Sequence, residues 1–179
     1  MRRLTYYVAC SVDGFIAHAD GSHDAFFDRD TDFNFVATLS DYDVLLMGRK
    51  TYDLSRRLGH STDPQKANYV FSRTMQASPD PNVEIVAENM VQFVRELKQE
   101  KGKGIWLVGG ADIATTLLVE HLIDEIILKV NPVLFGSGIS LFSGAIPETE
   151  LELLDSRVYR NGYLVLRYRV ETSVLTPED

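Results

Sequence analysis

The feature that most constrains the fold is a strand that runs into a helix through two glycines, over residues 104–113. Ile105 to Val108 is a short apolar run bounded by glycine, which is typical of a buried strand. From Ala111 to Glu120 the apolar residues recur at helical spacing. The turn between them, Gly109-Gly110, would direct free backbone N–H groups and the positive end of a helix dipole at one point, which favours a phosphate. Because Gly-Gly turns also occur without a ligand, this turn alone leaves both interpretations open.

The rest of the chain alternates predicted strands with predicted helices and ends in a hairpin. We expect strands at 4–10, 43–47, 68–71, 83–86, 105–108 and 122–130, helices from 32, just after 48, at 89–99 and at 111–120, and hairpin strands at 151–159 and 163–170. The predicted fold class is α/β, with a mostly parallel mixed sheet flanked by helices and an antiparallel C-terminal hairpin. We predict one domain over residues 1–171 and a polar tail over 172–179.

Composition argues against several classes of function. The 179 residues carry a formal net charge of −8, which disfavours nucleic acid or an anionic membrane as a partner. The chain has one cysteine, Cys10, and its four histidines lack metal-ligand spacing, so we predict neither a disulfide nor a metal site. No apolar stretch approaches the length of a membrane span, and the N-terminus does not resemble a signal peptide. We therefore expect a cytoplasmic protein.

Three predicted strand ends carry residues that could bind phosphate. They are Gly48-Arg49-Lys50-Thr51, Ser72-Arg73 and Gly109-Gly110. The carboxyl ends of parallel strands meet at one edge of a sheet, where ligands bind. Each segment alone could be an ordinary helix start or surface charge. Together they place cations, hydroxyl groups and glycine N–H groups at one edge, which suits a ligand with more than one phosphate.

Other polar and aromatic residues allow two interpretations. Asp13 follows a predicted strand and precedes a glycine, so it either forms a turn or faces a ligand. The aromatic group Phe26, Phe27, Phe33 and Phe35 either belongs to the core or walls a pocket. We expect the lysines at 98, 101 and 103 to form a solvated face.

The chain resembles the dihydrofolate reductase-like superfamily. It is most similar to the branch formed by the C-terminal reductase domain of the bifunctional riboflavin-biosynthesis deaminase-reductase and its stand-alone relatives. The motifs that carry the resemblance occur in family order and are Ser11-Val12-Asp13-Gly14, Met47-Gly48-Arg49-Lys50-Thr51, Ser72-Arg73, Val108-Gly109-Gly110-Ala111 and Pro132-Val133-Leu134-Phe135-Gly136-Ser137-Gly138.

The resemblance implies an NADPH-dependent reductase that transfers hydride to a C=N or C=O bond of a pteridine-, pyrimidine- or similar heterocycle-like substrate. The cofactor residues that it implies are Gly48, Arg49, Lys50, Thr51, Ser72, Arg73, Gly109, Gly110, Ala111, Asp112 and Ile113, with Ala9 and Ile16 lining the nicotinamide. It also suggests Asp32 as the proton donor, because Asp32 lies 16 residues before Gly48, a position similar to that of the family acid. The alternatives are that Asp32 is a solvated carboxylate at a helix start, or that Asp13 supplies the proton.

Two other functions and one assembly remain open at this stage. The chain could be a non-catalytic NADP(H)-binding module that has lost reductase chemistry, or a structural domain whose Gly-Gly turn binds nothing. We also expect a homodimer, because residues 132–142 are apolar, the final hairpin offers an uncovered edge, and the riboflavin-type relatives pair.

Overall fold

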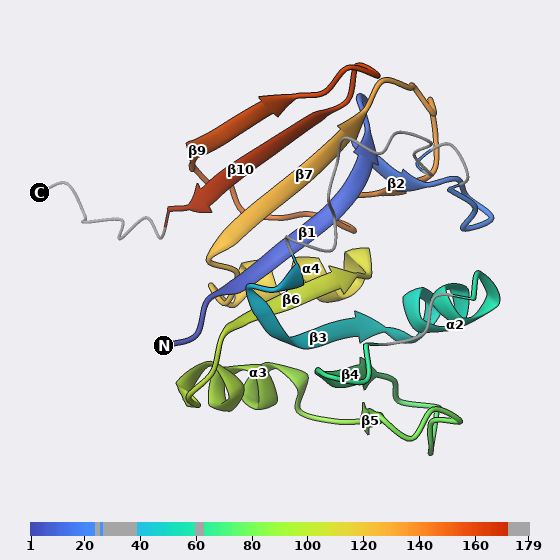
Figure 1. The fold of residues 1–179 in the computed structure, drawn as a ribbon, viewed down its shortest axis with the longest axis vertical. Coiled ribbons are helices and arrows are strands. Elements are labelled where there is room, and N and C mark those ends of the chain that lie inside the picture. Colours follow the sequence, from blue (N-terminus) through green and yellow to red (C-terminus); the bar gives the residue numbers. More distant parts are fainter. Residues whose placement is uncertain (24–25, 27–38, 60–62, 172–179) are drawn as a thin grey trace, which may run out of the picture.

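The computed structural model describes residues 1–23, 26, 39–59 and 63–171 (Figure 1). Within these ranges the centre of the molecule is an eight-stranded sheet with the order β5-β4-β3-β6-β1-β7-β10-β9. Its strands are β1 Leu4–Ser11, β3 Tyr42–Gly48, β4 Ala67–Phe71, β5 Val83–Val86, β6 Gly104–Gly109, β7 Glu125–Asn131, β9 Leu151–Val158 and β10 Leu164–Val170. The strands from β5 to β7 are parallel, whereas β10 and β9 form the antiparallel hairpin at one side. The predicted α/β class is confirmed, including the hairpin.

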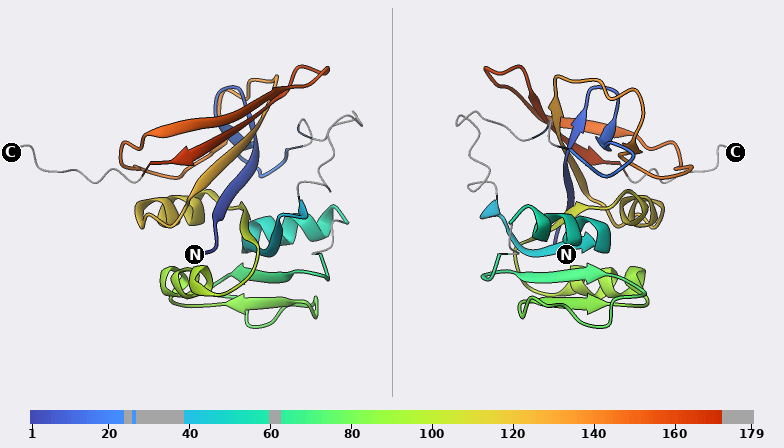
Figure 2. Two further views of the ribbon diagram at one scale, coloured as in Figure 1. Left: turned by 60° about the vertical axis from the view of Figure 1, so that its left-hand side comes forward. Right: turned by 90° about the vertical axis from the view of Figure 1, so that its right-hand side faces the viewer.

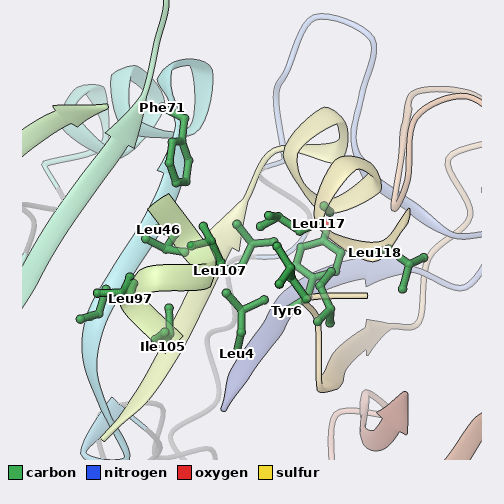
Figure 3. Packing of buried hydrophobic residues seen from close by; sticks show 14 of the residues in the cluster. Leu4, Tyr6, Leu46, Phe71, Leu97, Ile105, Leu107, Leu117 and Leu118 are labelled. Atoms are coloured by element: carbon green, nitrogen blue, oxygen red, sulfur yellow. The ribbon is translucent and has the colours of Figure 1, made fainter. Parts of the chain in front are cut away.

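Helices cover both faces of the sheet (Figure 2). The described helices are α2 Arg49–Arg57, α3 Met90–Gln99 and α4 Ala111–Val119. One hydrophobic cluster joins Leu4 and Tyr6 of β1 to Val94 of α3 and Leu117 of α4, as Figure 3 shows in part. The helix that the sequence predicts from Asp32 falls outside the described residues.

The second hydrophobic cluster lies on the opposite face of the sheet. It includes Tyr7 of β1, Trp106 of β6 and the fully buried Tyr52 of α2. Because successive side chains of a strand point to opposite faces, Tyr6 and Tyr7 belong to different clusters. This two-sided burial explains why β1, β3 and β6 read as continuous apolar runs instead of alternating patterns.

The structure differs from the sequence prediction in two places. Residues 15–17 and 139–140 form a small antiparallel sheet, β2 Phe15–Ala17 with β8 Ile139–Ser140, where no strand was predicted. The prediction of a solvated Lys98 is wrong, because its side chain is 5% exposed. Its Nζ donates hydrogen bonds to Leu122 O at 2.7 Å and Asp124 Oδ2 at 2.6 Å, and these acceptors offset the cost of burying the charge. No helix in the described part of the chain is long and apolar enough to cross a membrane.

Candidate functional site

The carboxyl ends of β3 and β6 approach each other so closely that only glycine fits without a shift. A Cβ built on Gly48 would lie 3.0 Å from Ile113 Cδ1 and 4.0 Å from Gly110 Cα. A Cβ built on Gly109 would lie 3.3 Å from Thr51 Oγ1. Gly110 has φ of +115°, which L side chains rarely adopt. The structure therefore brings together Gly48, Thr51, Gly109, Gly110 and Ile113, which the sequence predicts as one site.

Two helices begin at this meeting point. Gly48 is the N-cap of α2 and Gly110 is the N-cap of α4, and neither helix has a side-chain capping hydrogen bond within the described part of the chain. The first N–H groups of an α-helix have no partner inside the helix. Two such ends side by side form a seat for an anion. The other predicted residues of these first turns are Lys50, which is exposed, Ala111, which is buried, and Asp112, which is exposed.

Two arginine side chains, Arg49 and Arg73, lie at the loop that follows β4. Arg49 Nη1 donates to Thr74 Oγ1 at 3.0 Å, and Arg49 Nε is 3.3 Å from Asp53 Oδ2. The buried Ser72 shapes the loop, because its Oγ accepts a hydrogen bond from Met75 N at 3.0 Å. Arg73 is exposed in the same loop. The contact between Arg49 and Thr74 thus joins the predicted segment Gly48–Thr51 to the residue that follows Ser72-Arg73.

The carboxyl end of β1 borders the same edge, because β1 is the neighbour of β6 in the sheet (Figure 1). Ala9 is half-buried near this end, in register with Lys129 of β7. Ile16 is half-buried in β2, which follows the turn after β1. Ala9 is therefore on the strand next to β6, whereas Ile16 lies in β2, which pairs with β8 in a separate sheet.

Asp13 is held by hydrogen bonds from three directions. Its Oδ1 accepts from Ser11 Oγ at 2.6 Å and from Phe135 N at 3.1 Å, and its Oδ2 accepts from Gly136 N at 2.7 Å. The Ser11 hydroxyl, followed by the two backbone N–H groups, lowers the pKa of this carboxyl to about 2. The group is therefore ionised at neutral pH, which suits a hydrogen-bond acceptor better than a proton donor. Asp32 lies outside the described residues.

Sequence reasoning missed two features near the loop after β2. The first is a hollow of about 340 Å³ between the loop after β2 and helix α2, lined by Asp20, Gly21, Ser22, His23, Leu54, Arg57 and Leu58. The second is a stack of three rings, in which Phe135 lies between His18 (centroids 3.9 Å apart) and Phe26 (5.0 Å apart). The phenylalanine group around residue 26 gave a signal for an aromatic wall, but nothing in the sequence placed Phe135 beside it. Phe27, Phe33 and Phe35 lie outside the described residues.

Comparison with known proteins identifies the family of this chain. The family described as RibD C-terminal domain matches residues 2–165. The chain belongs to the RibD C-terminal domain family. Uncharacterized protein YwjB of Bacillus subtilis (strain 168) is 36% identical over 161 residues, which cover 88% of this chain and 92% of that protein.

Solved structures agree on the fold. A protein from Shewanella sp. PV-4, whose name associates it with riboflavin biosynthesis, superposes with a TM-score of 0.81 and 27% identity over 96% of this chain and 99% of its own. The diaminohydroxyphosphoribosylaminopyrimidine deaminase/5-amino-6-(5-phosphoribosylamino)uracil reductase of Thermotoga maritima has a TM-score of 0.70 at 18% identity, and the match covers 94% of this chain and 56% of that one. The resemblance to the dihydrofolate reductase-like superfamily is thus confirmed. The family match and the solved structures thus agree that this chain has the fold of the RibD C-terminal domain.

Proposed function

We propose that this RibD C-terminal domain chain is an NADPH-dependent reductase that reduces a C=N or C=O bond of a pteridine-, pyrimidine- or similar heterocycle-like substrate. The observation that carries the proposal is the pair of uncapped helix N-termini at Gly48 and Gly110, with their backbones in close approach. A pyrophosphate needs several N–H donors converging from different segments, and this arrangement supplies them.

The residues around the seat fit the rest of the cofactor. A Cβ at Gly48, Gly109 or Gly110 would meet side-chain atoms of Ile113 or Thr51, so the glycines let the two helix N-termini come close enough to bind one pyrophosphate. Arg49 and Arg73 flank the loop after β4, where they could pair with a 2′-phosphate. When bound, NADPH would supply the hydride. Ala9 and Ile16 would line its nicotinamide and exclude water from that end.

The hollow between the loop after β2 and helix α2 suits the substrate. Its volume of about 340 Å³ lies within the usual range of small-molecule pockets, ~300–1,000 Å³. Leu54 and Leu58 offer apolar surface, whereas Arg57 and His23 offer hydrogen-bond donors. A planar heterocycle with polar edges needs both apolar surface for its ring and hydrogen-bond donors for its edges. Reduction also needs a proton, for which Asp32 stays our candidate, because the low pKa of Asp13 makes Asp13 a poor donor.

The experiment that tests the proposal measures the loss of NADPH absorbance over time when the protein is mixed with candidate substrates. The two probes are 7,8-dihydrofolate, a pteridine, and 5-amino-6-(5-phosphoribosylamino)uracil, a pyrimidine. We expect loss of absorbance that depends on both the enzyme and one of these compounds. A chain that binds NADPH but reduces neither a pteridine nor a pyrimidine would instead be the non-catalytic NADP(H)-binding module. A chain that binds no NADPH would have a purely structural Gly-Gly turn.

A further inference from the structure

We propose that Asp13 is a positioning residue: its carboxylate holds the segment 133–138, and with it the stack of His18, Phe135 and Phe26, which adjoins the lining residue His23 of the substrate hollow. This inference rests on the proposed function. It assigns Asp13 a role in binding the heterocycle instead of a role in proton transfer.

The first observation is that Asp13 joins parts of the chain that are far apart in the sequence. It accepts the backbone N–H groups of Phe135 and Gly136, which lie 122 and 123 residues away. Backbone hydrogen bonds flank the turn around Asp13 on both sides: Val12 N donates to Val133 O at 2.9 Å, and Leu141, just after the segment, donates its N–H to Gly14 O at 3.0 Å. We call this set of hydrogen bonds between the turn around Asp13 and residues 133–141 the latch. Asp13 contributes its side chain to the latch, and the other bonds are between backbone groups.

The second observation is what the latched segment carries. The ring of Phe135 is nearly parallel to Phe26, at 9°, and to His18, at 21°. Stacked rings are sensitive to small displacements, so the position of the Phe135 backbone sets the position of the whole stack. Phe26 is 6.5 Å from the ring of His23, which lines the hollow. The latch therefore acts on the wall of the hollow through one residue.

The chemistry of the latch requires a carboxylate. Both oxygens accept hydrogen bonds, and a charged acceptor makes stronger bonds to N–H groups than a neutral one. An asparagine at position 13 has one acceptor oxygen, so its NH₂ group would face either the Phe135 or the Gly136 N–H. Asp13 stays ionised from neutral pH down to about 2, so the latch does not open in the pH range of an enzyme assay.

The test compares Asp13→Asn with Asp43→Asn. Asp43 is a matched control, since its carboxylate also joins distant segments, with Lys103 N at 2.9 Å and an ion pair to Arg2, but at the opposite edge of the sheet. Amide hydrogen exchange at Phe135 and Gly136 measures the latch without any substrate. The KM and kcat for 5-amino-6-(5-phosphoribosylamino)uracil with NADPH measure its effect on substrate binding, and the affinity of the pyrimidine from calorimetry replaces KM if turnover is too slow.

We expect Asp13→Asn to accelerate exchange at whichever of the two amides its NH₂ group faces and to raise the KM about tenfold, with the affinity for NADPH and the pH profile of kcat unchanged. Asp43→Asn should lower the melting temperature and leave the KM as it is. Unchanged amide exchange would refute the latch, and faster exchange with an unchanged KM would refute its role in binding. A lost limb of the kcat–pH profile would show that Asp13 is a proton donor after all. Failure of the proposed function gives a different result, because the wild-type chain itself would then bind neither NADPH nor the pyrimidine. That result refutes the role of Asp13 in substrate binding. Amide hydrogen exchange at Phe135 and Gly136 still decides whether the latch exists.

Discussion

Substitution of Gly48 by alanine tests whether the gap between the two helix N-termini holds a phosphate. The backbone of Gly48, with φ of −77° and ψ of 159°, is one that alanine adopts readily, so the variant introduces no conformational strain. Gly110 is a poorer choice because its φ of +115° would strain any other residue by roughly 1–3 kcal/mol. A loss of binding at position 110 could then reflect strain alone.

The expected magnitudes follow from the contacts of the added methyl group. Its nearest neighbour is Ile113 Cδ1 at 3.0 Å, the end of a flexible side chain, and overpacking of this kind costs about 1 kcal/mol. In a chain of this size that lowers the melting temperature by roughly 2–4 °C. One displaced charge-assisted contact to the pyrophosphate costs about 1.5–3 kcal/mol. We therefore expect NADPH to bind about tenfold to a hundredfold more weakly.

The assay is calorimetric titration with NADPH, and a second substitution separates packing from binding. Ile113→Val removes the Cδ1 atom that the new methyl group meets. Measured against Ile113→Val alone as the reference, the double variant Gly48→Ala with Ile113→Val should thus regain the melting temperature but keep the weak binding. If the double variant recovers full affinity, the methyl group acted only by displacing Ile113, and the phosphate does not approach Gly48.

Three further predictions concern the 2′-phosphate, the proton and the assembly. Arg73→Ala should weaken NADPH about tenfold to a hundredfold and leave NADH unaffected in calorimetry; equal losses would remove Arg73 from the 2′-phosphate site. Asp32→Asn should lower kcat by roughly 10²–10⁴-fold with NADPH affinity intact, whereas full turnover would exclude Asp32 as the acid. The chain should form a homodimer through the edge strand β9, which exposes Leu151, Leu153 and Val158. Light scattering should give twice the monomer mass for the wild type and the monomer mass for Leu153→Lys; a monomeric wild type at micromolar concentration contradicts this assembly.

The sequence predicted the parts of the site that local patterns specify. The run over residues 104–113 contains a strand signal, a turn signal and a helix signal within ten residues, and the structure has each of them in place. Gly48 was found in the same way, as the end of one apolar run and the start of a helix. Since parallel strands end at one edge, the placement of these segments at that edge followed from the fold class, whereas the structure shows that β3 and β6 are neighbours there.

The sequence could not predict contacts that depend on distant segments. Lys98 lies on a helix rich in charged residues, and its burial depends on acceptors at Leu122 and Asp124. Asp13 precedes a glycine and looks like a turn residue, but the N–H groups that it accepts come from Phe135 and Gly136. No periodicity or motif spacing encodes a pairing between residues more than a hundred positions apart.

The measurement that tests the central claim most directly is a crystal structure of the chain with NADPH. The account predicts the pyrophosphate over the N-termini of α2 and α4, within hydrogen-bond distance of backbone N–H groups after Gly48 and Gly110, with the nicotinamide beside Ala9. A pyrophosphate bound elsewhere, or no bound cofactor in crystals soaked with millimolar NADPH, would contradict it.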